Sequence, residues 1–128
     1  MIERVTAPGA PAPRGPYSPG VKAGDWIWVA GQVSMDPASG EAKLSDIKAE
    51  TRQTLLNVQS ILAACGAAMS QVVRCGVYLT NAADFQAMNE VYAEFFGDAK
   101  PARTTIIVAA LPLPGAKVEI DAVAYIGK

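Results

Sequence analysis

The sequence predicts a single α+β domain over residues 1–128, in which two helices pack on one face of a mixed β-sheet. A chain of 128 residues is typical of one domain. Hydrophobic residues make up 51% of the chain and charged residues only 18%, a balance typical of folded globular proteins. Segments rich in β-branched and aromatic residues alternate with two segments whose apolar residues recur every three or four positions, so strands and helices share the domain.

Four segments are predicted to be strands because β-branched and aromatic residues dominate them. They are residues 25–34, 71–80, 104–111 and 117–126. Residues 7–20 hold five prolines and three glycines, which predicts an irregular or extended arm before the first strand. A turn is expected at 36–40, and the strand–helix–strand unit at 71–111 should join two parallel strands.

Two segments have the periodicity of amphipathic helices. Over residues 45–65 the apolar positions form one stripe, and Gly66 follows where a helix end favours glycine. The second helix carries apolar residues from Phe85 onward and ends at Gly97, with Asn81 or Asp84 as its N-cap.

The last predicted strand is apolar on both of its faces. One face is wholly apolar, and the other combines Glu119 and Asp121 with Val123 and Tyr125. Two helices can cover only one face of the sheet, so the second face needs another cover. Oligomerisation is the simplest one.

Composition excludes several classes of function. The chain has no histidine, and its two cysteines, Cys65 and Cys75, are not clustered with other ligands. A metal site and a serine-hydrolase triad are therefore not expected, and no glycine-rich phosphate loop suggests another cofactor. A formal net charge of -1 predicts no nucleic-acid partner. No apolar run could span a bilayer and no signal-peptide pattern opens the chain, which favours a soluble, cytoplasmic protein without a membrane partner.

Without histidine, two charged residues at strand starts are the main candidates for chemistry. Arg103 follows Pro101-Ala102, where its planar guanidinium could grip a carboxylate through two parallel hydrogen bonds. Glu119 lies between Val118 and Ile120, where limited solvent access would raise its pKa towards a useful acid–base range. Asp121 shares its face and competes for the role. A solvated arginine and an exposed carboxylate remain the plain alternatives.

Two short motifs suggest places where a ligand could approach. Gly15-Pro16-Tyr17-Ser18 is a turn with a phenol beside it, and Ala30-Gly31-Gln32 ends a strand. Glycine at a strand end lets a ligand reach main-chain groups closely. Each motif alone is equally compatible with a purely structural role.

Six motifs follow one another along nearly the whole chain. They are Gly15-Pro16-Tyr17-Ser18, Ala30-Gly31-Gln32-Val33, the turn at 36–41, the helix segments at 52–58 and 88–96, and Pro101-Ala102-Arg103 with Val118-Glu119-Ile120 downstream. In this order they resemble the RidA family of enamine and imine deaminases, also called the L-PSP endoribonuclease family.

The resemblance implies a chorismate-mutase-like α+β sandwich that forms a homotrimer with its sheets facing inward. It implies hydrolysis of reactive 2-imino acids, such as 2-iminopropanoate and 2-iminobutanoate, to 2-keto acids and ammonia. By the family motifs, Arg103 would bind the substrate carboxylate and Glu119 would activate the attacking water. Tyr17, Gly31, Asn89 and the main chain of Thr105 would line the pocket.

Two departures from the commonest family pattern bear on the substrate. Thr104-Thr105 stands where many family members have a small residue and cysteine, and the 112–117 turn is slightly longer. A paralogue acting on another enamine, of the aminoacrylate or aminomuconate type, therefore stays open. A non-enzymatic trimeric binding or chaperone-like module is a further alternative, although a binder would need only Arg103 and not Glu119. An endoribonuclease is the least favoured, because the chain has no basic patch and no histidine pair.

Strand geometry adds an expectation about where the site lies. If the strands that begin near Arg103 and Glu119 run antiparallel, their starts lie at opposite ends of the sheet, about 20 Å apart. Such a distance is too long for one small imino acid. The two residues would then come from different chains, with each site at a subunit interface.

Overall fold

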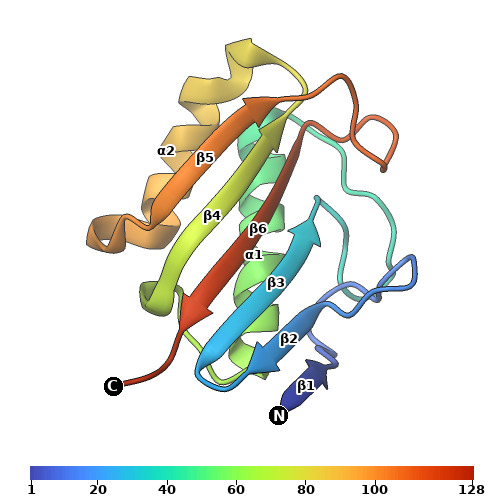
Figure 1. Cartoon of the computed structure of the whole chain (residues 1–128). Helices are drawn as coiled ribbons and strands as arrows, with labels where there is room; N and C mark the ends of the chain where they lie inside the picture. The colour runs from blue at the N-terminus through green and yellow to red at the C-terminus, as the bar shows by residue number, and fades with distance from the viewer.

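A computed structural model describes residues 1–128 as a six-stranded sheet covered on one face by two α-helices (Figure 1). The strands are β1 (Ile2–Val5), β2 (Gly20–Ala23), β3 (Trp26–Gln32), β4 (Val72–Leu79), β5 (Ala102–Ile107) and β6 (Val118–Tyr125). The helices are α1 (Ile47–Ala64) and α2 (Phe85–Phe96), with short 3₁₀ turns at Met69–Gln71, Ala82–Asp84 and Gly97–Ala99. The predicted α+β class, with a mixed sheet and both helices on one face, is confirmed.

The strand order is β1-β2-β3-β6-β4-β5. Only β4 and β5 are parallel, and they are joined through α2, as predicted for the unit at 71–111. Strand β6 pairs antiparallel with β3 on one side and with β4 on the other. Strands β5 and β6 do not touch, because β4 lies between them. They run in opposite directions, because β4 is parallel to β5 and antiparallel to β6.

Three features of the sheet differ from the sequence prediction. Strands β1 and β2 were not predicted, because each has only four residues and β2 begins directly after the proline-rich arm. Strand β5 ends at residue 107 instead of 111. Strand β5 is an edge strand that pairs only with β4, and its last pair is Ile107 with Leu79, the residue at which β4 ends.

Side-chain caps and glycines fix the helix ends. Asp46 Oδ1 accepts a hydrogen bond of 2.9 Å from the Ala49 N–H at the start of α1. Gly66 has a φ of 84° after the end of α1, and its N–H donates to Ala63, which is the geometry that favours glycine. Of the two proposed caps of the second helix, Asp84 stands at the N-cap position of α2 but makes no side-chain cap bond. Asn81 caps the preceding 3₁₀ turn, where it accepts the Ala83 N–H.

The core lies between the helices and one face of the sheet. Alternate residues of the central strands point towards α1, so Ile27, Val77 and Ile120 are fully buried. They pack in one cluster with Leu55 and Ile61 of α1. This cluster holds β3, β6 and β4 in place, and these strands carry much of the site described below.

The other face of the sheet, here called the open face, carries exposed aromatic side chains. Trp26 and Trp28 are 42% and 49% exposed, and the rings of Trp26 and Tyr125 lie 4.8 Å apart. Contiguous exposed apolar surface of this kind marks an interaction face. The predicted apolar character of the second face is therefore confirmed. Neither helix of the chain is long and apolar enough to cross a membrane.

Candidate active site

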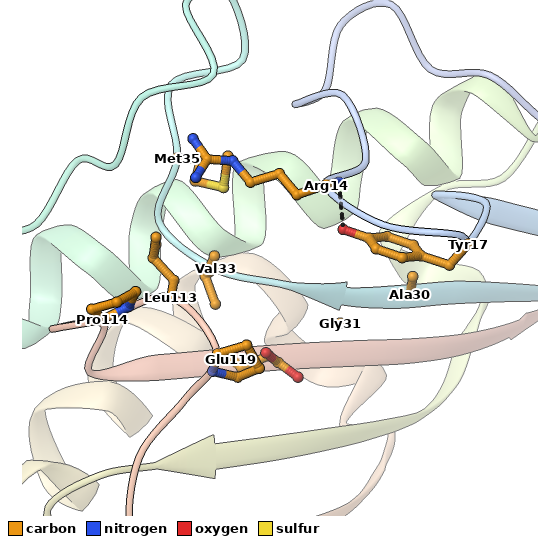
Figure 2. Close-up of a pocket in the computed structure, with 10 residues that line it drawn as sticks. Arg14, Tyr17, Ala30, Gly31, Val33, Met35, Leu113, Pro114 and Glu119 are labelled. Carbon is orange, nitrogen blue, oxygen red and sulfur yellow. Dashed lines mark hydrogen bonds between the residues drawn. The ribbon is translucent and has the colours of Figure 1, made fainter.

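A cavity of about 460 Å³ brings together three residues that the sequence singled out (Figure 2). Tyr17 comes from the N-terminal arm, Gly31 from the end of β3 and Glu119 from β6. The arm is held against the sheet by a hydrogen bond of 2.9 Å from the Ala30 N–H to the Pro19 carbonyl. This bond places the Tyr17 ring beside the end of β3.

A β-bulge lets the Glu119 carboxyl lie against the main chain of Gly31. The register between β3 and β6 shifts between Val29 and Gln32, so Ala30 and Gly31 leave the regular ladder. A Cβ atom on Gly31 would lie 2.5 Å from Glu119 Oε2, a separation that no side chain tolerates. The sequence indicated a close approach at Gly31 but gave no sign of the bulge that produces it.

The environment of Glu119 suits a general base. Burial raises the pKa of its carboxyl above the ordinary value, and the neighbouring Asp121 carboxylate raises the pKa further. A carboxyl with a raised pKa holds a proton more readily once it has accepted one. Glu119 can therefore take a proton from a bound water and return it later in a reaction.

Asp121, the competing carboxylate, is engaged in hydrogen bonds within the sheet. Its Oδ1 accepts a hydrogen bond of 2.8 Å from the Gly76 N–H, and its Oδ2 accepts one of 2.9 Å from the Tyr78 hydroxyl. Arg74 Nη1 lies 3.8 Å from Oδ1. Because both carboxylate oxygens are engaged, the structure favours Glu119 over Asp121 as the acid–base group.

Arg14 is a further cavity residue, and the sequence analysis did not single it out. Its main-chain N–H donates to the Tyr17 hydroxyl at 3.2 Å, and its Nη2 donates to the Gly40 carbonyl. The available signal was a lone arginine in an arm of proline, alanine and glycine, directly before the Gly15-Pro16-Tyr17-Ser18 motif.

Arg103 lies elsewhere, on the helix-covered face at the outer edge of the sheet. Its guanidinium carbon is 4.7 Å from the centre of the Tyr92 ring and 5.7 Å from that of Phe85, both on α2. Aromatic faces attract a guanidinium and orient it without occupying its N–H donors. Arg103 takes part in none of the four ion pairs of the chain. Its donors are thus available to a carboxylate.

Three buried polar atoms near Arg103 have no partner within the chain. They are Asn89 Oδ1, Tyr92 Oη and Thr105 Oγ1. Arg103, Asn89 and Tyr92 line a shared cavity of about 350 Å³. Unpaired buried polar groups are rare in folded proteins and need an explanation such as a ligand. The predicted residues Asn89 and Thr105 therefore belong with Arg103, not with Glu119.

The main chain of Thr105 faces away from the rest of the sheet. The Val108 N–H donates to Leu79 on β4, and successive N–H groups of a strand point to opposite sides. The N–H of Thr105 consequently points to the free edge of β5. A main-chain donor is therefore present at this edge whatever side chain follows Thr104.

Burial also sets the acid–base state of the groups behind Arg103. It raises the pKa of the Cys75 thiol to about 11 and raises the pKa of the Tyr92 phenol above its ordinary value. Both groups are therefore neutral near pH 7, and the charged residues that line this cavity are the cations Arg103 and Lys100. No group of three His, Cys, Asp or Glu side chains is placed to hold a metal ion.

One chain does not bring Arg103 and Glu119 together. Arg103 pairs with Cys75 on β4 and points to the helix-covered face, whereas Glu119 pairs with Tyr78 and points to the open face. The register puts their Cα atoms about 14 Å apart, less than the expected 20 Å, because they lie only three residues apart along β4. The sheet itself separates the two side chains.

Comparisons with known proteins show the family to which the chain belongs. A family model for Endoribonuclease L-PSP matches residues 8–126, nearly the whole chain. The chain belongs to this family. A RutC family protein of Pyrococcus horikoshii is 46% identical over 125 residues, which cover 98% of each chain.

Two other members of the L-PSP family bear on activity and fold. A protein of Dermatophagoides farinae named 2-iminobutanoate/2-iminopropanoate deaminase is 38% identical over 122 residues, which cover 95% of this chain and 94% of that one. The crystal structure of RidA from the Antarctic bacterium Psychrobacter sp. PAMC 21119 is 36% identical and superposes with a TM-score of 0.92, covering 97% and 99% of the two chains. The L-PSP family thus includes imine deaminases, and its RidA members share this fold.

Proposed function

We propose that the protein hydrolyses reactive 2-imino acids, among them 2-iminopropanoate and 2-iminobutanoate, to 2-keto acids and ammonia. The observation that carries this proposal is the Glu119 carboxyl, whose pKa is raised by burial, placed against Gly31 in a cavity. Kinship to a protein named 2-iminobutanoate/2-iminopropanoate deaminase supports the same reaction. The role is clearance of reactive metabolites.

The reaction needs little from the protein because a protonated imine carbon is already electrophilic. Glu119 accepts a proton from a bound water as the water oxygen bonds to C2 of the substrate. The tetrahedral carbinolamine then forms. Glu119 returns the proton to the nitrogen and then accepts the hydroxyl proton as the C=O double bond forms and the C–N bond breaks. The ammonia that leaves takes this last proton from Glu119 as ammonium, and the 2-keto acid remains. No external cofactor takes part, and positioning supplies several kcal/mol of the barrier lowering.

The substrate carboxylate requires a cation, and Arg103 is the proposed one. Since Arg103 and Glu119 lie on opposite faces of one sheet, the proposal places each site between two chains of a homotrimer. Arg103, Asn89 and the Thr105 N–H of one chain would face Tyr17, Gly31 and Glu119 of the next. The exposed Trp26, Trp28 and Tyr125 of the open face supply the apolar surface for such an assembly.

A coupled assay tests the proposed function. A pyridoxal-phosphate threonine or serine dehydratase generates the imine, and formation of the keto acid is followed with and without the protein. Semicarbazide in the mixture traps the remaining imine, so hydrolysis lowers the yield of semicarbazone. We expect faster keto-acid release and less semicarbazone with the wild-type protein, and neither change with Glu119→Gln. A wild-type protein that leaves both rates unaltered would refute the proposal.

A further inference from the structure

Arg14 places a positive charge in the cavity that holds Glu119. Its guanidinium comes from the N-terminal arm and extends along the side of the cavity that Tyr17 and Met35 line, while Glu119 enters from the opposite side (Figure 2). Arg14 and Glu119 are the two charged residues of the cavity lining. Arg14 has no role in the proposed hydrolysis of simple imino acids.

The charge of Arg14 is not neutralised within the chain. Nη2 donates to the carbonyl of Gly40, which is a neutral acceptor, and none of the four ion pairs includes Arg14. A guanidinium has five N–H donors, so most of them remain available. The Gly40 bond still restrains the side chain, because the turn that contains Gly40 is itself fixed by the Asp36 carboxylate bound to the Ala38 and Ser39 N–H groups.

The wall between the two charges is apolar. Val33, Met35, Leu113 and Pro114 line it, and the cavity volume of about 460 Å³ lies within the ~300–1,000 Å³ of pockets that bind ligands larger than a three-carbon acid. Arg14 is exposed, so a long apolar substrate side chain would fill this space without giving the guanidinium a partner. A chain of methylene groups that ends in a carboxylate fits both the wall and the charge, because carboxylates bind a guanidinium through paired hydrogen bonds.

We propose that Arg14 is a specificity-determining residue that binds a second carboxylate of the substrate, so that 2-imino dicarboxylic acids of the aspartate and glutamate type are favoured. This inference rests on the proposed function and names its substrate class. Arg103 binds the carboxylate next to the imine, and Arg14 binds the one at the end of the side chain. The reaction is unchanged: water adds to C2, the C–N bond breaks, and a 2-oxo dicarboxylate and ammonium are released.

A purely structural role for Arg14 makes a different prediction. As a clamp between the arm and the 36–40 turn, Arg14 would support the cavity for every substrate alike. Its loss would then lower turnover of all imines by the same factor. A carboxylate-binding role changes the ratio of turnover between charged and neutral side chains, so this ratio is the quantity to measure.

The test compares imines that differ only at the end of the side chain. Flavin-dependent amino-acid oxidases form the imines of glutamate, glutamine and norvaline in place, with catalase to remove peroxide and semicarbazide to compete for the imine. We expect wild-type kcat/KM to be highest for the glutamate imine. In Arg14→Gln the ratio of glutamate to glutamine imine should fall by about 10- to 100-fold, the size typical of a hydrogen bond to a charged group. Arg14→Lys should keep part of the ratio, and Arg4→Gln, which replaces an exposed arginine on β1, should keep all of it.

Two results would overturn the inference. One is a wild-type protein that processes the glutamine imine as well as the glutamate imine. The other is an Arg14→Gln variant that loses both activities equally, which is the result expected of a purely structural clamp.

If no imine at all is hydrolysed, the proposed function fails, and a binding experiment decides the role of Arg14. Calorimetry should then show 2-oxoglutarate binding at least tenfold tighter than 2-oxopentanoate to the wild type, with this preference lost in Arg14→Gln; equal affinities would exclude it.

Discussion

Gly31 and Glu119 are so close that a methyl group on Gly31 would lie 2.5 Å from the Glu119 carboxyl oxygen. Gly31 does not have a positive φ, so the need for glycine here is one of space and not of backbone conformation. Gly31→Ala should therefore displace the carboxyl while leaving the bulge in place. Misplacing a reacting group by about 1 Å can lower a rate about 100-fold, and we expect kcat/KM for imine hydrolysis to fall by this order.

The control for this variant is Gly9→Ala. A Cβ on Gly9 would meet Ser60 at an ordinary contact distance of 3.9 Å. Both variants should retain the wild-type circular dichroism spectrum, and only Gly31→Ala should lose activity. An active Gly31→Ala protein would show that Glu119 does not have to occupy its observed position.

The acid limb of the pH–rate profile should report Glu119. As a general base it must be ionised, so kcat/KM should fall as the pH drops through its pKa, which burial and Asp121 raise above the ordinary value. Asp121→Asn removes the second of these causes and should lower the pKa of Glu119, so that activity persists to lower pH. Asparagine can still accept the Gly76 N–H, which limits damage to the sheet.

Asp25→Asn serves as the control, since it removes an exposed carboxylate near the far end of β3. Its acid limb should coincide with that of the wild type. If the acid limb of Asp121→Asn coincides with that of the wild type, the pH dependence does not come from Glu119.

A buried carboxylate anchors the start of β6 and with it Glu119. Glu50 on α1 accepts hydrogen bonds from the Lys117 N–H at 2.9 Å, the Ser45 N–H at 3.1 Å and Lys117 Nζ at 3.1 Å. Glu50→Ala would leave the two main-chain N–H donors without this acceptor, whereas Lys117 Nζ would keep its hydrogen bond of 2.7 Å to the Ser45 carbonyl. We expect it to lower the free energy of unfolding by about 3 kcal/mol, measured by urea denaturation at fixed protein concentration.

Two further substitutions calibrate this loss. Glu50→Gln keeps an oxygen acceptor and should cost less. Glu90→Ala breaks only the exposed ion pair with Lys48, so it should change the unfolding free energy far less than Glu50→Ala does. If Glu50→Ala is as mild as Glu90→Ala, Glu50 does not anchor β6.

The long periodic elements of the fold could be predicted from the sequence, whereas the short ones could not. The apolar stripe of α1 and the alternation in β6 each repeat over many residues, so burial of one face leaves little choice of structure. Strand β2 has four residues and one β-branched side chain, and it exists because β3 offers it a partner. A pairing of this kind depends on tertiary context, which local sequence does not encode.

The residues of the candidate site also differ in how far the sequence could predict them. Arg103, Glu119 and Gly31 could be proposed from the sequence because each residue type in its local pattern already suggests a chemistry. The difference between Glu119 and Asp121 could not, since it depends on Gly76 and Tyr78, which are more than 40 residues away along the chain. The role suggested for Arg14 depends on a cavity built by three separate segments.

Reassembly of two inactive variants tests whether the site is shared between chains. Arg103→Ala removes the proposed carboxylate ligand and Glu119→Ala removes the proposed base, so each protein alone should be inactive. When equal amounts are unfolded together and refolded, random mixing in a cyclic trimer would give about a quarter of the interfaces an intact Arg103 from one chain and an intact Glu119 from the next. A comparable fraction of wild-type activity should return, because the opposite faces occupied by these residues prevent one chain from forming the site. Refolding each variant separately before mixing is the control and should restore nothing. Mixed trimers that are demonstrated by mass spectrometry and yet stay inactive would rule out a site built from Arg103 and Glu119 of different chains.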